Sequence, residues 1–155
     1  MPSVSRTALT PRLEVHRGRY KAQAEHLLEK VRQHYIYPPG DNRASGYLST
    51  DMAWITPIVD DLAELVGVRF NILALQGYKD GTAGTAWHAD DNFGDQAIIS
   101  LGVTRLFGIR RGGNEASYLL DAGDLVHLPT GLEHRIIPQP DVTGERVALV
   151  FRVPT

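Results

Sequence analysis

Residues 70–91 have the sequence FNILALQGYKDGTAGTAWHADD, and this stretch decides both the fold and the candidate chemistry of the chain. It begins with a short apolar run and breaks at Gly and Asp, a pattern typical of a β-strand followed by a turn. His88 and Asp90 lie near its end with one residue between them. We expect them to close a strand, where alternate side chains point to the same side. An imidazole and a carboxylate that converge in this way provide two ligands of a 2-His-1-carboxylate site, which suits non-haem Fe(II).

A third ligand is available further along the chain. His134 follows the turn-forming sequence PTGLE at residues 129–133 and is expected to open a new strand. A His-x-Asp motif alone also occurs in surface turns, so the metal hypothesis depends on this second His. Strands that are distant in sequence lie side by side in a jelly roll, and His134 can therefore share a metal ion with His88 and Asp90.

Short apolar runs separated by Gly, Asp and Asn continue from residue 70 to the end of the chain. Strands are expected at residues 70–78, 97–102, 105–110, 116–120, 124–128, 134–137 and 147–153. Many short strands with turn signals between them indicate a β-sandwich or jelly roll.

The first part of the chain has a different, helical pattern. Apolar residues recur at helical spacing within residues 20–34. A second helix is expected at residues 57–66, with Thr56 as its N-cap and Gly67 as its C-terminal stop. Residues 43–50 fit either a loop or a short strand. Two helices followed by strands indicate a mainly β, α+β fold in which the helices buttress one outer face of a sheet.

Length and composition are consistent with a single globular domain. The chain has 155 residues, of which 43% are hydrophobic and 22% charged. We assign residues 1–155 to one domain, with the helices and a possible substrate lid in residues 1–69 and the jelly-roll core in residues 70–155. The Ser-, Thr- and Pro-rich residues 1–12 are expected to be poorly ordered at their start.

Cysteine content and hydropathy exclude several classes of protein. The chain has no Cys, which excludes disulfides, thiolate zinc sites and a Cys nucleophile. Its apolar runs are too short to cross a membrane, and its N-terminus lacks a signal-like hydrophobic segment. We therefore expect a monomeric, cytoplasmic protein that does not contact membranes.

The order of the motifs resembles that of the AlkB-like Fe(II)/2-oxoglutarate-dependent dioxygenases. The matching elements are Phe70-Asn71, Tyr78-Lys79-Asp80-Gly81, Trp87-His88-Ala89-Asp90-Asp91, Gly123-Asp124 ahead of His134, and Arg146 with Arg152. They span a little over half of the chain, whereas the N-terminal part matches only loosely.

This resemblance implies an oxidoreductase that uses Fe(II), O2 and 2-oxoglutarate. The iron ligands would be His88, Asp90 and His134. Arg152 would bind the distal carboxylate of 2-oxoglutarate, with a hydrogen bond from Tyr78 to the same co-substrate. Arg146 would point inward from the same strand, close to Asp90 and the keto-acid end.

The spacing of the two arginines supports a co-substrate pocket. Arg146 and Arg152 are an even number of residues apart, so they share one face of a terminal strand with Ala148 and Val150. Buried arginines need anionic partners, and a planar guanidinium matches a carboxylate with two hydrogen bonds. The family usually has Asn, Asn and Thr where this chain has Gln76, Ala148 and Val150. Gln76 can still donate to a co-substrate oxygen, but the two apolar residues make the pocket drier.

Four side chains are candidates for contact with the substrate: Asp91, Trp87, Tyr47 and Arg43. Asp91 can instead hold the neighbouring ligand in place or be a solvated acid, and Trp87 can be structural. Tyr47 and Arg43 fit either a substrate lid or a plain loop.

The remaining His and Arg residues have simpler interpretations. His127 is expected to be a satisfied or partly exposed strand residue, and Arg110 with Arg111 a solvated pair rather than a phosphate clamp. Surface positions are expected for His16, His26 and His34.

Three functions compete at this point. The resemblance favours oxidative demethylation of N-alkylated nucleic-acid bases, with single-stranded or unstacked bases as substrate. The alternative is a related dioxygenase that hydroxylates a protein side chain, a small molecule or a base carbon. The formal net charge of -2 and the short N-terminal region favour that alternative, because a nucleotide-binding lid should be rich in Lys and Arg. The third is a non-catalytic jelly-roll binding module, against which the metal and Arg positions argue.

Overall fold

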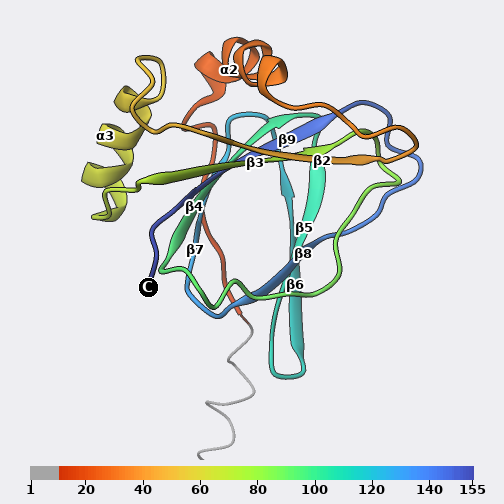
Figure 1. Ribbon diagram of the computed structural model, residues 1–155. Coiled ribbons are helices and arrows are strands. Elements are labelled where there is room, and N and C mark those ends of the chain that lie inside the picture. Colours follow the sequence, from red (N-terminus) through yellow and green to blue (C-terminus); the bar gives the residue numbers. More distant parts are fainter. Residues whose placement is uncertain (1–10) are drawn as a thin grey trace, which may run out of the picture.

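Two antiparallel β-sheets face each other in the computed structural model, which describes residues 11–155 (Figure 1). The larger sheet has six strands in the order β1-β7-β4-β9-β3-β2, and the smaller has three in the order β6-β5-β8. Most neighbouring strands of the large sheet are distant in sequence, as expected for a jelly roll, and the predicted fold class is therefore confirmed. The prediction that the chain is poorly ordered at its start falls on residues 1–10, which lie outside the described part.

The strands form where the apolar runs predicted them. The large sheet contains β1 (Glu14–His16), β2 (Arg43–Leu48), β3 (Ile72–Tyr78), β4 (Gln96–Gly102), β7 (Leu125–Leu128) and β9 (Arg146–Arg152). The small sheet contains β5 (Arg105–Arg111), β6 (Asn114–Leu120) and β8 (Glu133–Ile136). Two strands, β1 and β2, precede residue 70 and form the edges of the large sheet, so the sheet is larger than the sequence indicated.

Both expected helices are present. The first consists of η1 (Lys21–Gln23), α2 (Ala24–Val31) and η2 (Arg32–His34), and the second is α3 (Thr56–Val66). Gly67 ends α3 with a left-handed φ of 76°. The N-cap prediction is wrong: Ile55 is the N-cap residue and makes no side-chain capping bond, because the helix already begins at Thr56.

The core has two layers, one on each face of the large sheet. On the outer face, the helices pack through residues such as Leu27 and Leu62 against Leu149 of β9. On the inner face, Val150 of the same strand packs with Ile109 of the small sheet. The alternation in β9 thus matches the faces expected from the sequence, and the helices buttress the outer face of the sheet (Figure 1). Among residues 11–155, no helix has the length and apolar character needed to cross a membrane.

A half-buried carboxylate joins the first helical segment to the start of β9. Glu145 accepts hydrogen bonds from the Tyr35 and Tyr37 hydroxyls at 2.7 and 2.6 Å and from Nε of Arg32 at 2.9 Å. Burial by itself raises the pKa of Glu145, but the hydrogen bonds from Tyr37, Tyr35 and Arg32 outweigh it and leave the pKa lowered. The folded state therefore favours the charged form of this residue.

We expect Glu145→Gln to destabilise the protein by about 1–3 kcal/mol, because a neutral amide is a weaker acceptor than a carboxylate for two hydroxyls and a guanidinium. Because the folded-state pKa is lowered, this contribution is present above the ordinary Glu pKa of 4.5 and is lost as the pH falls. Urea unfolding at pH 7 and at acidic pH measures both effects. Glu29→Gln, at an exposed position of α2, is the control. Equal stability of the two variants at pH 7 would contradict the assignment.

Candidate functional site

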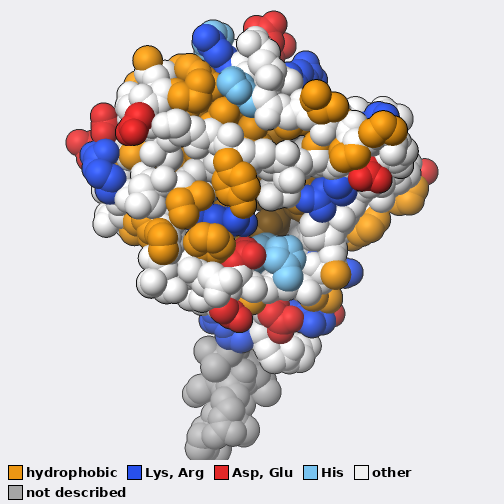
Figure 2. Space-filling view, in the orientation of Figure 1, with side chains coloured by type: hydrophobic (Ala, Val, Ile, Leu, Met, Phe, Trp, Pro, Cys, Tyr) orange, Lys and Arg blue, Asp and Glu red, His pale blue; other side chains and the backbone are white. Residues whose placement is uncertain are grey.

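A cavity of about 200 Å³ opens between the two sheets. Its walls come from β2, β3, β4 and β9 of the large sheet, from β5 and β8 of the small sheet, and from the segment that follows β3. Figure 2 shows a hollow on this face, with His and charged side chains of both signs gathered around it. The three predicted ligands, both predicted arginines, Tyr78 and Gln76 all line this cavity.

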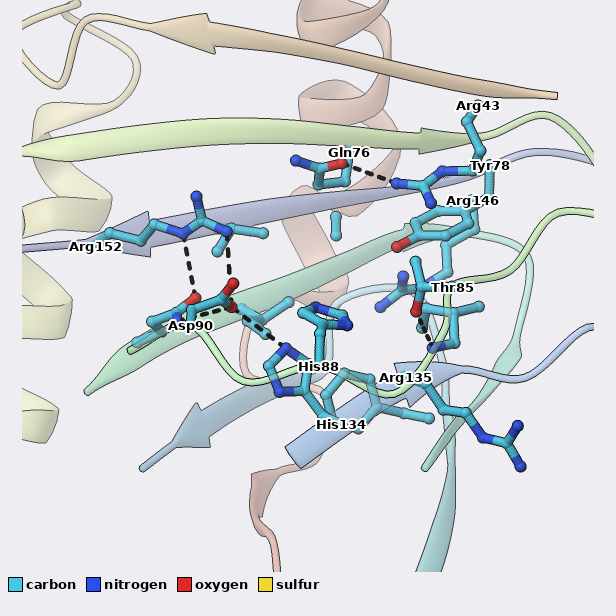
Figure 3. Close-up of a pocket in the computed structure, with 16 residues that line it drawn as sticks. Arg43, Gln76, Tyr78, Thr85, His88, Asp90, His134, Arg135, Arg146 and Arg152 are labelled. Carbon is cyan, nitrogen blue, oxygen red and sulfur yellow. Dashed lines mark hydrogen bonds and ion pairs between the residues drawn. The ribbon is translucent and has the colours of Figure 1, made fainter. Parts of the chain in front are cut away.

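The three predicted metal ligands converge at one end of the cavity (Figure 3). Ligand atoms of His88, Asp90 and His134 all lie within 4.8 Å of one another, and Nε2 of His134 is 3.4 Å from Oδ2 of Asp90. The local conformation differs from the expected strand end, because β3 stops at Tyr78 and residues 79–87 form turns and irregular backbone. An isolated bridge holds His88 instead: its N–H and C=O bond the backbone of His134 at 3.1 and 2.9 Å.

Hydrogen bonds to the backbone fix which imidazole nitrogen is free. Nδ1 of His88 lies 2.9 Å from the carbonyl oxygen of Ala86, and Nδ1 of His134 lies 2.9 Å from that of Leu132. A carbonyl oxygen can only accept, so Nδ1 is the protonated nitrogen in both rings. Each Nε2 lone pair is therefore available to a metal ion.

The carboxylate at this end is held in its charged form. The adjacent imidazole of His134 lowers the pKa of Asp90, burial opposes this, and a hydrogen bond from Gln96 lowers the pKa further to well below its usual range. Asp90 is thus ionised at neutral pH. Two imidazole nitrogens and one carboxylate are the donor set of non-haem Fe(II) sites with open positions, so these residues fit that ion.

The two arginines of β9 occupy opposite ends of the cavity (Figure 3). Nη2 of Arg152 lies 3.9 Å from Oδ2 of Asp90. Arg146, which the sequence placed near Asp90, donates instead to Oγ of Ser100 at 2.9 Å and lies 5.3 Å from the Tyr78 ring centroid. That placement of Arg146 was wrong, because an extended strand rises about 3.3 Å per residue and carries the two side chains far apart.

The end of the cavity near Arg146 has an excess of positive charge. Arg146 is only 1% exposed, its Nε has no hydrogen-bond partner among residues 11–155, and burial lowers its pKa to about 10, so it stays cationic at neutral pH. The guanidiniums of Arg43 and Arg105 lie 4.1 and 5.9 Å from the Tyr78 ring centroid. None of the three arginines forms an ion pair within the described part of the chain. Arg146 in particular is a buried cation in the cavity wall, and such a cation favours an anionic ligand here.

Arg43 and Gln76 form part of this cationic end. Nη2 of Arg43 donates to Oε1 of Gln76 at 2.9 Å, and its other nitrogens donate to the carbonyls of Gly77 and Gly84. The Gln76 carbonyl is thus occupied, which leaves its amide N–H groups as the donors available in the cavity. Arg43 was predicted as a possible lid residue, and the structure places it instead in the cavity wall on β2.

Trp87 is not among the residues that line the cavity, and its packing is that of a structural residue rather than of a substrate contact. Its indole lies against Gly108 on the outer side of the small sheet, where a larger residue would collide with the ring. The guanidiniums of Arg110 and Arg135 lie 4.6 and 4.5 Å from the ring centroid. Arg110 also pairs with Glu133 at 2.8 Å, so it is not the solvated residue that the sequence suggested. This packing anchors the segment that contains His88.

The other two substrate candidates lie outside the cavity wall. Asp91 is exposed next to the ligand Asp90. Tyr47 is 71% exposed on β2, on the same side of the strand as Arg43. Contact of either residue with a substrate remains a prediction.

Gln96 is a site residue that was not predicted from the sequence. Gln96 is buried at the start of β4 and contacts both Asp90 and Arg152, while Ser100 on the same face contacts Arg146. The signal was present: two polar residues at even spacing interrupt the apolar run of β4. Thr85 and Arg135 also line the cavity without having been predicted.

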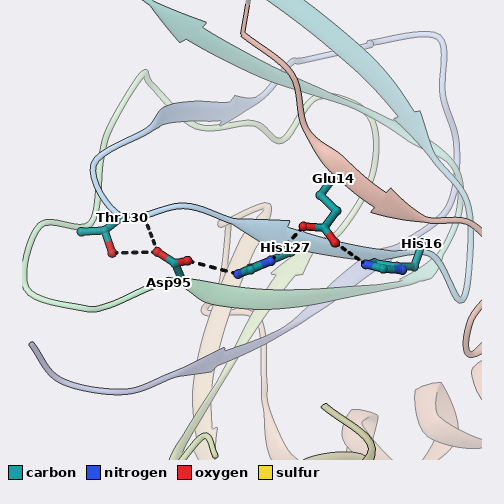
Figure 4. A network of polar contacts seen from close by, with 5 residues as sticks. All are labelled: Glu14, His16, Asp95, His127 and Thr130. Carbon is teal, nitrogen blue, oxygen red and sulfur yellow. Dashed lines mark hydrogen bonds and ion pairs between the residues drawn. The ribbon is translucent and has the colours of Figure 1, made fainter. Parts of the chain in front are cut away.

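His127 is a satisfied, partly exposed strand histidine, as predicted (Figure 4). Its Nδ1 lies 3.0 Å from a carboxylate oxygen of Glu14, and its Nε2 lies 3.2 Å from one of Asp95. The other Asp95 oxygen accepts the backbone N–H of Thr130 at 2.9 Å. Glu14 also contacts His16 at 3.0 Å. The network ties β1 and β7 to the turn that precedes His134.

Comparisons with known proteins support the resemblance to AlkB-like dioxygenases. The chain matches no family model. It is 34% identical over 91 residues to "DNA oxidative demethylase ALKBH2" of Arabidopsis thaliana, a match that covers 52% of this chain and 29% of that protein. The chain therefore spans less than a third of the length of this relative.

Solved structures share the fold at low sequence identity. A 2OG-Fe(II) oxygenase family oxidoreductase from Burkholderia pseudomallei has a TM-score of 0.61 and 14% identity over 82% of this chain and 75% of that one. A Pseudomonas putida prolyl-4-hydroxylase has a TM-score of 0.67 and 16% identity over 98% and 97%. Lactobacillus farciminis oxalate decarboxylase has a TM-score of 0.53 and 12% identity over 81% and 32%. These likenesses establish the jelly-roll fold of such enzymes, and the reaction must be argued from the site.

We expect Asp90→Ala to reduce Mn(II) or Fe(II) binding by at least about tenfold, because one of three ligands and its charge are lost. The fold should be retained, since Asp90 lies in irregular backbone after β3. Anaerobic titration calorimetry measures the affinity, and circular dichroism checks the fold. Asp91→Ala removes an exposed neighbouring carboxylate and should leave metal affinity unchanged. Unchanged affinity in Asp90→Ala would remove Asp90 from the site.

Proposed function

We propose that this chain is an Fe(II)/2-oxoglutarate-dependent dioxygenase. One observation supports this above all others: His88, Asp90 and His134 converge in the same cavity as two inward-facing arginines of β9. A metal site alone fits many proteins, and so does a buried cationic pocket. Their combination matches a divalent metal with an anionic co-substrate beside it, and the similarity to ALKBH2 points to the same chemistry.

Each part of the site then has a defined task. His88, Asp90 and His134 would hold iron through two Nε2 atoms and a carboxylate. When bound, iron supplies the oxidising chemistry that consumes O2 and converts 2-oxoglutarate to succinate and carbon dioxide. The backbone acceptors of Ala86 and Leu132 keep both imidazoles in the metal-binding tautomer.

The geometry favours an exchange of the two arginine roles suggested by the resemblance. Arg146 with Tyr78 would bind the distal carboxylate, since the buried Arg146 guanidinium has no ion pair in the described part of the chain and a carboxylate would neutralise it. Arg152 lies beside Asp90 and would contact the co-substrate at the metal end. Gln76 would donate to the co-substrate from β3, while Ala148 forms an apolar wall.

Arg146→Met tests this exchange. The variant should be at least as stable as the wild type without ligands, because an unpaired buried charge is removed. Its affinity for 2-oxoglutarate should fall by at least about tenfold, since charge-assisted hydrogen bonds are lost. Thermal unfolding with and without Mn(II) and 2-oxoglutarate reports both effects. Arg69→Met, in an exposed ion pair with Asp60, is the control. Full stabilisation of Arg146→Met by 2-oxoglutarate would show that the distal carboxylate binds elsewhere.

For the substrate, we propose N-alkylated bases in single-stranded nucleic acid, which would lose the alkyl group oxidatively. The similarity to ALKBH2, a DNA oxidative demethylase, supports this class. A net charge of -2 provides little general attraction for phosphates, so contacts must come from local cations such as Arg111 and Lys79. A duplex substrate would also cost a few kcal/mol for extruding the base. The alternative is hydroxylation of a protein side chain, a small molecule or a base carbon, and the fold shared with a prolyl-4-hydroxylase is compatible with it.

Methylated oligonucleotides separate these two substrate classes. With Fe(II), ascorbate and 2-oxoglutarate at low salt, mass spectrometry should detect loss of the methyl group from single-stranded DNA or RNA and little loss from duplex. Binding should weaken steeply with salt, by about 0.7 log units per phosphate contact and decade of salt. Arg111→Glu should weaken oligonucleotide binding and spare succinate formation without substrate. Succinate release stimulated by peptides or metabolites, with methylated oligonucleotides unchanged, would favour the alternative.

A further inference from the structure

A single buried amide joins the metal site to the co-substrate site. Nε2 of Gln96 donates to Oδ2 of Asp90 at 3.1 Å, and its Oε1 accepts from Nε of Arg152 at 3.2 Å. Gln96 itself is only 3% exposed. The assignment of the amide is unambiguous, because a carboxylate cannot donate and a guanidinium cannot accept.

We propose that Gln96 is a positioning residue that couples Asp90 to Arg152, an inference that rests on the proposed function. Nη2 of Arg152 and Oδ2 of Asp90 are 3.9 Å apart, whereas a direct charge-assisted hydrogen bond is about 2.7–2.9 Å long. The amide satisfies one hydrogen-bonding group of each partner and so keeps them from closing into a direct ion pair. Asp90 thereby remains available to the metal ion and Arg152 to the co-substrate.

The strand pairing gives Gln96 this position. Ala97 of β4 pairs with Phe151 of β9, so Gln96 and Arg152 are the next residues along the ladder and face the same side. The Arg152 guanidinium is held from the other side by the Phe93 ring, whose centroid is 4.6 Å away. The arginine therefore has a defined orientation before any ligand binds.

The residue before Gln96 fixes the start of the strand (Figure 4). Asp95 accepts hydrogen bonds from N and Oγ1 of Thr130 at 2.9 and 3.1 Å and also contacts His127. Consecutive residues thus anchor the two sides of this segment, with Asp95 toward the turn ahead of His134 and Gln96 toward Asp90. Because the backbone on both sides of Gln96 is held in place, by Asp95 before it and by the β4 ladder after it, its side chain can orient two partners.

Only a group with both a donor and an acceptor can perform this task. A carboxylate at position 96 would repel Asp90, an amine would repel Arg152, and an aliphatic residue would leave both charged partners unsatisfied. Gln96→Met has similar length and flexibility but neither hydrogen bond, so it removes the coupling while largely preserving the packing.

We expect Gln96→Met to weaken Mn(II) binding roughly tenfold, the lower range for loss of a hydrogen-bonding partner of a metal ligand. The KM for 2-oxoglutarate should rise several-fold, because Arg152 then pairs with Asp90. If this pairing is the cause, Gln96→Met combined with Arg152→Met should bind Mn(II) more tightly than Gln96→Met alone. Anaerobic Mn(II) titration followed by electron paramagnetic resonance measures the affinities without turnover.

Gln139→Met is the matched control. Its Oε1 accepts from Nε of Arg105 and the backbone N–H of Leu106, so the same substitution removes two hydrogen bonds away from the metal ligands. It should lower the free energy of unfolding without changing Mn(II) affinity. Equal loss of Mn(II) affinity in Gln139→Met, or an effect of Gln96→Met that is the same with and without Arg152, would overturn the coupling. Wild-type protein that binds no Mn(II) would instead contradict the proposed function itself.

Discussion

The site depends on one short backbone contact, the bridge between His88 and His134. Two hydrogen bonds join an irregular segment after β3 to the strand β8 of the small sheet. They bring the two imidazole centroids to 4.2 Å, although the residues are far apart in sequence. Packing of Trp87 over Gly108 holds the same segment from the outer side of the sheet. Metal ligands on irregular backbone can therefore be as well fixed as ligands on a strand.

At the cationic end of the cavity, near Arg146, the stability of the fold and the binding of an anionic ligand make opposite demands. Arg105, which is fully buried, satisfies its guanidinium with backbone carbonyls of Asp80, Ala83 and Ile137, as expected for a structural role. Arg146 differs, because it has one hydrogen bond and an unpaired Nε. The apolar layers on both faces of β9 provide the stability that tolerates such a charge. A buried donor of this kind can hydrogen-bond an anionic ligand that enters the cavity.

Much of this arrangement could be predicted from residue patterns. Short apolar runs located the strands of the jelly roll, and the His-x-Asp motif with a later His located the metal ligands. Patterns failed where tertiary geometry decided the outcome. Even spacing placed Arg146 and Arg152 on one face but could not say which end of the cavity each would reach. Arg43 was ambiguous because its role depends on pairing between β2 and β3, and no local signal indicates that pairing.

The residues that sequence analysis missed are those that connect the predicted ones. Gln96 and Ser100 are polar residues on the inner face of β4, and each contacts one arginine of the adjacent β9. Sequence motifs identify the residues that bind ligands. The residues that orient those side chains lie on the adjacent strand, which the motifs do not indicate. Because Ala148 and Val150 cannot hydrogen-bond, orientation of the β9 arginines must come from β4 and β3 instead. The apolar residues Ala148 and Val150, which depart from the usual family residues, are therefore accompanied in the same pocket by the polar residues Gln96 and Ser100 of β4.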